Sequence, residues 1–262
     1  MSGKGPGTAA LSAGALSGWS APRSVPDLPP DEVHVWLADR VRFGRALDRL
    51  EAMLDPAERG RAGRFRFESD RAVFVLGRGW LRFLLGRLTG VRPDAVSLAV
   101  AEHGKPFLPV GPGGPAPAFN LSHSGDLALI AVAAGGRLGV DVERIDPDRD
   151  VDPIADRFFS AREAATLAVL APSLRRRAFY ACWTRKEAYL KALGRGLSIP
   201  LKSFSVSLDP GEAPELLESD GGVGGWWLED VSPSPSFAAA LAGDTRRPRV
   251  RLFAAAAPLL ES

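Results

Sequence analysis

Apolar and polar positions alternate, or apolar residues run together, in four short segments of the chain. These segments are typical of β-strands and cover residues 33–38, 96–101, 127–133 and 138–143. The last two are separated only by the turn Ala134-Gly135-Gly136-Arg137, and this short connection predicts a hairpin. We expect the polar segment FNLSHSG, residues 119–125, to lie at the mouth of that hairpin.

A different period, with apolar residues three or four positions apart, predicts a helix in the arginine-rich stretch between Asp55-Pro56 and Gly90. Its apolar stripe is formed by Phe74, Gly77, Trp80, Leu81, Leu84 and Leu88. The opposite face is shared by Arg71, Arg78 and Arg82. Residues 59–92 hold nine arginines and two acidic residues, a local net charge of +7. This stretch is either a solvated helix face or a site for a ligand with several phosphates, which guanidinium groups bind through forked donors.

A second helical period carries charge in its apolar stripe. The stripe is formed by Phe179, Trp183, Leu190 and Leu193. Lys186 falls in the same stripe and Glu187 lies on its flank, while Gly194 is placed to cap the end of the helix. Glu187 and Lys191, one turn apart, could form an ordinary intrahelical ion pair. Such a pair would not explain the lysine at position 186.

Asp141 and Glu143 share one face of the strand at 138–143, because side chains alternate along a strand. Two carboxylates about 7 Å apart on one strand repel each other unless water or a cation separates them. One interpretation is a half-exposed acidic strand. The other is an oxygen-ligated Mg²⁺ site, with Mn²⁺ as the alternative ion, for which Glu187 would supply a third carboxylate.

Composition excludes several classes of protein. A chain of 262 residues with 45% apolar residues can bury one large core or two smaller ones, while residues 1–30, rich in Gly, Ala, Ser and Pro, predict a flexible extension. The net charge of +2 does not favour nucleic-acid binding, and no apolar run nears the roughly 18 residues of a membrane span. The single cysteine, Cys182, excludes an internal disulfide and favours a cytoplasmic location. The chain contains no P-loop, dinucleotide GxGxxG or HExxH motif.

Five segments together resemble the 4′-phosphopantetheinyl transferase superfamily, in its monomeric, double-length type known from the activation of surfactin synthetase. They are HGKPF (103–107), FNLSHSG (119–125), GVDVE (139–143), RFFS (157–160) and WTRKEAYLKALGRGL (183–197). The resemblance implies an α+β fold of two similar halves related by a pseudo-twofold, assigned here to residues 31–137 and 138–262, with coenzyme A in the cleft between them. It also implies magnesium-dependent transfer of 4′-phosphopantetheine from coenzyme A to a serine of an apo acyl or peptidyl carrier protein, with release of 3′,5′-ADP.

The resemblance also implies roles for single residues. Asp141, Glu143 and Glu187 match the magnesium ligands of the family. Lys186 and Lys191 match residues that hold the coenzyme A phosphates or assist transfer. Further coenzyme contacts are expected at Arg61, Arg78, Lys105, Ser122, His123 and Asp141, with Arg61 facing the 3′-phosphate. Glu187 is the first choice for the general base, with a bound water as the alternative, and Asp141 and Lys186 complete the expected catalytic set.

The segment after RFFS matches the region that docks the carrier protein, which would belong to polyketide, nonribosomal peptide or fatty acid biosynthesis. Two other functions stay open. A non-catalytic coenzyme A binding module would not need three acids and two lysines, and another magnesium-dependent phosphotransferase would be expected to carry a glycine-rich nucleotide loop. We expect a monomer that binds neither nucleic acid nor membranes.

Overall fold

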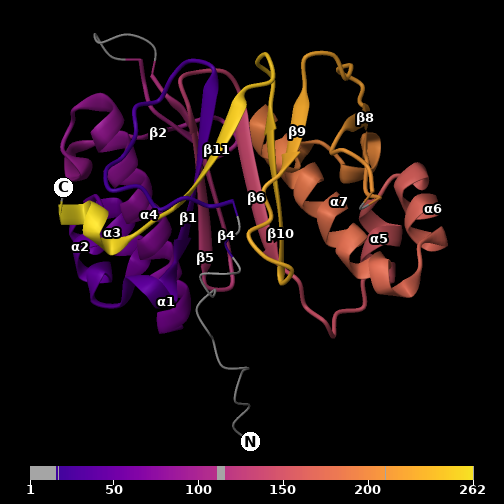
Figure 1. Cartoon of the computed structure of the whole chain (residues 1–262), viewed down its shortest axis with the longest axis horizontal. Coiled ribbons are helices and arrows are strands. Elements are labelled where there is room, and N and C mark those ends of the chain that lie inside the picture. Colours follow the sequence, from indigo (N-terminus) through magenta and orange to yellow (C-terminus); the bar gives the residue numbers. More distant parts are fainter. Residues whose placement is uncertain (1–15, 17, 111–115, 210, 262) are drawn as a thin grey trace, which may run out of the picture.

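Two sheets lie side by side in the middle of the molecule, with helices on both outer sides (Figure 1). The structure, a computed structural model, describes residues 16, 18–110, 116–209 and 211–261. The helices of the N-terminal half cover one outer side, and those of the C-terminal half cover the other. Within the described ranges, no helix has the length and apolar character needed to cross a membrane.

The sheet of the N-terminal half has four strands in the order β11-β1-β5-β4. Their bounds are Arg249–Ala254 for β11, Glu32–Asp39 for β1, Leu127–Ala133 for β5 and Ala118–Ser124 for β4. The helices of this half are α1 (Arg40–Phe43), α2 (Leu47–Ala52), α3 (Pro56–Ala62) and α4 (Glu68–Thr89). The apolar stripe predicted for α4 packs in one core with Trp36 of β1.

The sheet of the C-terminal half has three strands in the order β6-β10-β9. They span Leu138–Arg144, Phe237–Gly243 and Trp227–Asp230, respectively. The helices are α5 (Asp152–Phe158), α6 (Ala161–Val169) and α7 (Pro172–Leu193). A Cβ at Gly139 of β6 would collide with the Ala188 carbonyl of α7, so glycine at this position permits the close approach of helix and strand.

The two halves repeat the same order of elements, which confirms the α+β fold with a pseudo-twofold. Each has a first strand, short helices, a helix of 22 residues, a small two-stranded sheet and an antiparallel hairpin. The small sheets pair β2 (Ala99–Val100) with β3 (Pro106–Phe107) and β7 (Ser205–Val206) with β8 (Leu216–Glu218). Both long helices end at a glycine in the left-handed region, with φ of 71° at Gly90 and 70° at Gly194.

Strand β1 contributes side chains to two hydrophobic cores, one from each of its faces. Val33, Val35 and Leu37 join a cluster with residues of both sheets, while Trp36 on the alternate face packs with the helices of the N-terminal half. The cluster shared by both sheets also contains Val140 and Leu241. The two halves are therefore joined through an apolar layer between their sheets.

The hairpin predicted from residues 127–143 is wrong in its pairing. Strand β5 pairs with β4, whereas β6 pairs with β10, almost 100 residues later in the chain. The turn at 134–137 carries the chain from one sheet to the other. Side-chain alternation cannot distinguish these pairings, because each strand presents the same side chains to the core whichever strand it pairs with.

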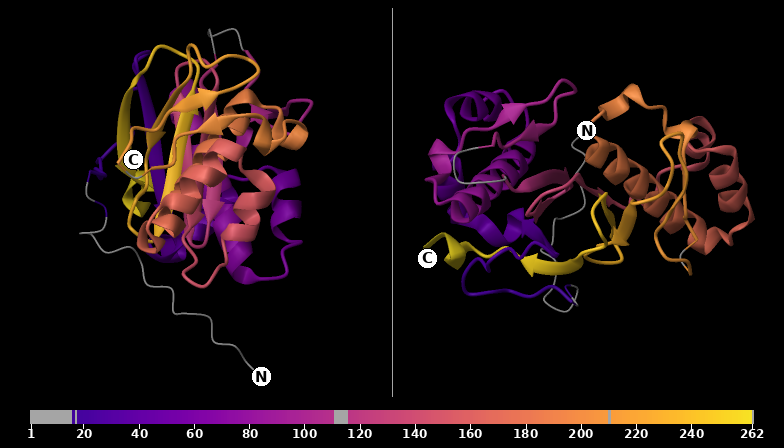
Figure 2. Two further views of the ribbon diagram at one scale, coloured as in Figure 1. Left: turned by 90° about the vertical axis from the view of Figure 1, so that its right-hand side faces the viewer. Right: turned by 90° about the horizontal axis from the view of Figure 1, so that it is seen from above.

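The chain ends also differ from the predicted division. Within residues 1–30, predicted to be flexible, Leu16 and Trp19 are buried, and the Ser20 amide donates a hydrogen bond to the Leu252 carbonyl; residues 1–15 and 17 lie outside the described residues. Strand β11 was assigned to the C-terminal half but pairs in parallel with β1 (Figure 2). The segment Ala257–Glu261 follows it and adds Leu259 to the core of the N-terminal half.

Candidate active site

Asp141 lies at the seam where β6 runs beside β4. Its Oδ1 accepts hydrogen bonds from the Ser122 hydroxyl at 2.8 Å and from the Lys191 ammonium at 2.6 Å. Its Oδ2 is buried and receives no hydrogen bond from the described residues. A buried carboxylate oxygen without a donor is costly, so this atom is placed to meet a ligand or ion.

The other two predicted carboxylates lie close enough to sense the charge of Asp141. Burial raises the pKa of Glu143, and the charge of Asp141 raises it further, although the Ser124 hydroxyl donates to Glu143 at 2.8 Å. Burial and Asp141 also raise the pKa of Glu187. Lys191, which could have paired with Glu187 within the helix, forms its ion pair with Asp141 instead.

These carboxylates do not form a closed metal cage. Among the described residues, no group of three or more His, Cys, Asp or Glu side chains has the arrangement to hold a metal ion by itself. Mg²⁺ nevertheless binds most often through one or two carboxylates, waters and substrate phosphates. The unpartnered Oδ2 of Asp141 and the all-oxygen donor set fit such an open site.

Basic groups surround His123 of β4. Burial of the imidazole lowers the pKa of His123, and the positive charges of Lys191, Arg61 and Arg78 lower it further. The structure therefore brings these four predicted coenzyme contacts together. Arg61 also lies over the ring of Phe74, 5.2 Å from its centroid.

Two arginines of the arginine-rich stretch, Arg82 and Arg71, are paired with acidic residues. Arg82 is fully buried and pairs with Asp55 and Glu58, and its guanidinium also donates to backbone carbonyls. Arg71 pairs with Glu51 and with Glu68. Because both guanidinium groups are held by acids, neither is available to phosphate, and the net charge of +7 over residues 59–92 overstates the charge open to a ligand.

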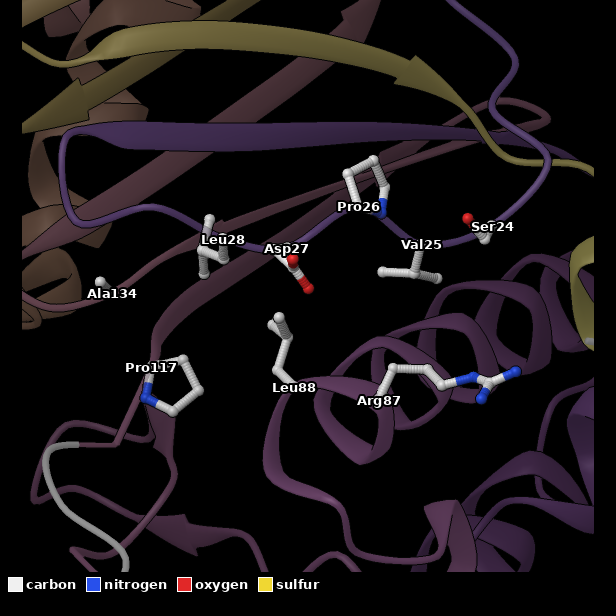
Figure 3. Close-up of a pocket in the computed structure, with 9 residues that line it drawn as sticks. All are labelled: Ser24, Val25, Pro26, Asp27, Leu28, Arg87, Leu88, Pro117 and Ala134. Carbon is white, nitrogen blue, oxygen red and sulfur yellow. The ribbon is translucent and has the colours of Figure 1, made fainter.

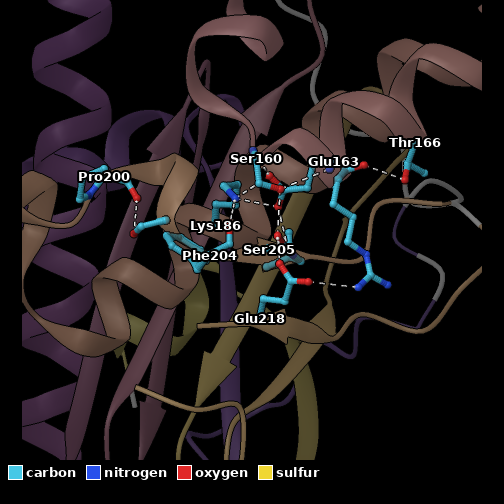
Figure 4. A network of polar contacts seen from close by, with 11 residues as sticks. Ser160, Glu163, Thr166, Lys186, Pro200, Phe204, Ser205 and Glu218 are labelled. Carbon is cyan, nitrogen blue, oxygen red and sulfur yellow. Dashed lines mark hydrogen bonds and ion pairs between the residues drawn. The ribbon is translucent and has the colours of Figure 1, made fainter. Parts of the chain in front are cut away.

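Lys186 does not reach the cleft, and its predicted catalytic and coenzyme-binding roles are wrong. Its side chain is 0% exposed, and its ammonium donates to both carboxylate oxygens of Glu163, at 2.7 and 2.6 Å, and to the Phe204 carbonyl at 2.7 Å (Figure 4). The three ammonium donors are thus used within the C-terminal half. Lys186 lies in the apolar stripe because a buried carboxylate pairs with it there.

The partner of Lys186 was missed by the sequence analysis, although a signal exists. Glu163 and Ser160 form a capping box at the start of α6, in which each side chain bonds the backbone amide of the other. Glu163 also accepts from the Val206 amide. The pattern Ser-x-x-Glu marks the cap, but nothing local indicates that its glutamate also receives a lysine from α7.

Two other predicted coenzyme contacts already have protein partners. The Lys105 ammonium donates to the carbonyls of Leu138 at 2.9 Å and Lys191 at 2.6 Å, and so ties the end of α7 to a loop of the N-terminal half. Burial lowers the pKa of Lys105 to about 8. The Ser122 hydroxyl donates to Asp141 and accepts from Lys191 and the Val142 amide, which uses its donor and both acceptor positions.

Two cavities differ in whether predicted site residues line them. A cavity of about 620 Å³ lies between residues 24–28 and the end of α4, and it is lined by none of the predicted site residues (Figure 3). A smaller cavity of about 200 Å³ opens beside Glu143 and Ser124, with Phe179 and Trp183 in its wall. Only the smaller of these two adjoins the carboxylates.

Comparison with known protein families matches both halves of the chain. Residues 38–135 match the family described as 4′-phosphopantetheinyl transferase, N-terminal, and residues 137–242 match the 4′-phosphopantetheinyl transferase superfamily.

Individual relatives extend over most of the chain. The 4′-phosphopantetheinyl transferase HetI of Nostoc sp. is 37% identical over 212 residues, which cover 81% of this chain and 87% of the relative. A 4′-phosphopantetheinyl transferase of Bacillus subtilis is 36% identical, and the transferase Sfp of Bacillus subtilis strain 168 is 32% identical; each match covers 62% of this chain and 69% of the relative. Among solved structures, holo-[acyl-carrier-protein] synthase of Thermotoga maritima aligns with 42% of this chain and 64% of its own at 24% identity, with a TM-score of 0.35 that is too low to support a structural argument.

Proposed function

We propose a reaction for this chain from the premise that it belongs to the 4′-phosphopantetheinyl transferase superfamily and is a 4′-phosphopantetheinyl transferase. The donor is coenzyme A and the acceptor is a serine of an apo carrier protein, acyl or peptidyl. The serine hydroxyl attacks the β-phosphorus of the coenzyme A pyrophosphate, and 3′,5′-ADP leaves. The observation that carries this proposal is the convergence of three carboxylates and four basic groups at the seam of the two halves.

The residues divide the work by charge. Asp141, Glu143 and Glu187 would hold Mg²⁺ together with pyrophosphate oxygens, and the ion would supply positive charge to those oxygens. Lys191 is placed to offset the charge that develops on the phosphates, because its ammonium lies at the seam beside Asp141. In this proposal, Lys191 replaces Lys186 as the catalytic lysine.

The serine proton is taken up by Glu187. A general base works best when its pKa is close to the operating pH, and burial together with Asp141 shifts the pKa of Glu187 in that direction. The Glu187 carboxylate forms no hydrogen bond or ion pair with another described residue, so it would be available to the acceptor hydroxyl or to a water that relays the proton.

The basic residues of the N-terminal half bind the coenzyme. Arg61 faces the 3′-phosphate, while His123 and Arg78 contact phosphate oxygens on the same side. Coenzyme A would thus span the seam, with its pyrophosphate near Asp141. Since one chain supplies both halves of the seam, we propose that it acts as a monomer in the cytoplasm, on carrier proteins of polyketide, nonribosomal peptide or fatty acid biosynthesis.

Mass spectrometry of apo-carrier proteins tests the reaction. Purified protein, coenzyme A and Mg²⁺ are incubated with acyl and peptidyl carrier domains and with variants in which the acceptor serine is replaced by alanine. A mass gain of one phosphopantetheine unit on the serine-containing domain alone is expected. No gain on any carrier, or a gain on the alanine variant, would contradict the proposal.

A further inference from the structure

An edge strand of each sheet lies at the seam, and the two strands form no backbone ladder with each other. Strand β4 is the last strand of its sheet and β6 is the first of the other, so each has amide and carbonyl groups on its outer edge that need partners. The outer amides of β6 belong to Val140, Val142 and Arg144. Their partners are side chains of β4 rather than its backbone.

These side chains form a ladder in register. Every second residue of β4 accepts from every second amide of β6: Asn120 from Val140 at 2.8 Å, Ser122 from Val142 at 3.4 Å and Ser124 from Arg144 at 3.0 Å. The pairs are offset by a constant 20 residues, so the two strands run in the same direction. A slip by one residue would turn all three acceptors to the wrong face.

The serines of this ladder also touch the acidic residues of the seam. A hydroxyl has one donor and two acceptor positions, and a fixed backbone amide occupies one acceptor position of each serine. Each serine hydroxyl donates its hydrogen to a carboxylate: Ser122 donates to Asp141 and Ser124 donates to Glu143, both at 2.8 Å. The same contacts that set the register of the two halves therefore orient the carboxylates.

We propose that Ser124 is a positioning residue for Glu143, and that the ladder of Asn120, Ser122 and Ser124 couples the docking of the two halves to the geometry of the metal site. The inference rests on the proposed function, because it assumes that Glu143 is a metal ligand. Ser124 is the most informative position, since Glu143 takes no other side-chain hydrogen bond from the described residues. At Ser122, by contrast, Lys191 also holds Asp141.

The test compares Ser124→Ala with Ser124→Thr, which keeps the hydroxyl on a side chain suited to a strand. Ser203→Ala is the matched control, because Ser203 is exposed and its hydroxyl donates only to the nearby Pro200 carbonyl. Mn²⁺ binding to each full-length protein is measured by electron paramagnetic resonance of the free ion. Turnover is measured against Mg²⁺ concentration, and thermal unfolding is recorded for each variant.

Ser124→Ala should weaken Mn²⁺ binding by about tenfold or more, the effect of removing a hydrogen-bond partner of a metal ligand. Its Mg²⁺ requirement should rise by a similar factor, with kcat at saturating Mg²⁺ much less affected. Ser124→Thr and Ser203→Ala should match the wild type. Wild-type metal dependence in Ser124→Ala, or a Thr variant as impaired as the Ala variant, would overturn the inference. Absence of transfer by the wild type would instead overturn the proposed function.

Discussion

Replacement of Lys186 by methionine separates a structural lysine from a catalytic one. The ammonium is fully buried against Glu163, so Lys186→Met leaves a carboxylate with 1% exposure and no cation beside it. Breaking a buried ion pair in this way costs about 3–5 kcal/mol of unfolding free energy. Glu163 keeps its bonds from the amides of Ser160 and Val206, so we expect the lower part of that range, about 3 kcal/mol.

Urea denaturation and thermal unfolding measure this loss. For a chain of this size, about 3 kcal/mol corresponds to a melting temperature lower by about 6–12 °C. The double variant Lys186→Met/Glu163→Gln removes the stranded charge and should regain about 1–2 kcal/mol over Lys186→Met alone. Lys202→Met, at an exposed lysine, is the control and should change stability by less than about 0.5 kcal/mol.

Activity completes the test. Well below its melting temperature, Lys186→Met should lose much less than the hundredfold or more expected when a group that stabilises transition-state charge is removed. The opposite result, wild-type stability with a hundredfold loss of single-turnover transfer, would refute the structural account and return Lys186 to the coenzyme phosphates.

Three further variants test the seam. Glu187→Gln should lower turnover by about a hundredfold or more, and near-normal turnover would contradict its role as general base. The raised pKa of Glu187 gives stability that is present below its unfolded pKa and is lost as pH rises through the folded pKa. At pH 7 the variant should therefore be as stable as wild type or more so. Arg61→Ala should weaken coenzyme A by about 1.5–3 kcal/mol and dephospho-coenzyme A much less, and equal losses in calorimetry would move Arg61 off the 3′-phosphate. A bound phosphate should raise the lowered pKa of His123, so coenzyme A should bind wild type more tightly as pH falls from 7 towards 6. His123→Gln should weaken this dependence of coenzyme A affinity on pH. The same pH dependence in His123→Gln as in wild type would show that another group takes up the proton.

The sequence identified local elements far better than their partners. The period of apolar residues located both long helices and the strands β1, β5 and β6, because burial of one face is a local property of each segment. The apolar period could not predict that β6 pairs with β10 rather than with β5, since pairing with either strand would bury the same apolar side chains. Of the strand predicted at 96–101, only Ala99–Val100 forms a strand, because its partner β3 is equally short.

The candidate site was predicted in the same uneven way. Asp141 and Glu143 stood out because two acids on one strand face need a reason, and the structure places them at the seam with Ser122 and Ser124. The burial of Arg82 was not predictable from its own helix, because its acidic partners lie at the start of another helix, α3. Polar groups with distant partners are therefore the part of the site that local pattern misses.

Helix α7 shows why adjacent charged residues of one motif can have unrelated tasks. Successive residues of a helix point about 100° apart, so Lys186 and Glu187 cannot face the same surroundings. Lys186 turns into the C-terminal half, where Glu163 holds it, while Glu187 and Lys191, one turn apart, face the seam and sense the charge of Asp141. The buried pair ties α7 to α6 and to the Phe204 carbonyl, whereas Gly139 permits the close approach of α7 to β6. Lys186 can therefore stabilise the helix that carries Glu187 and Lys191 without itself touching the substrate.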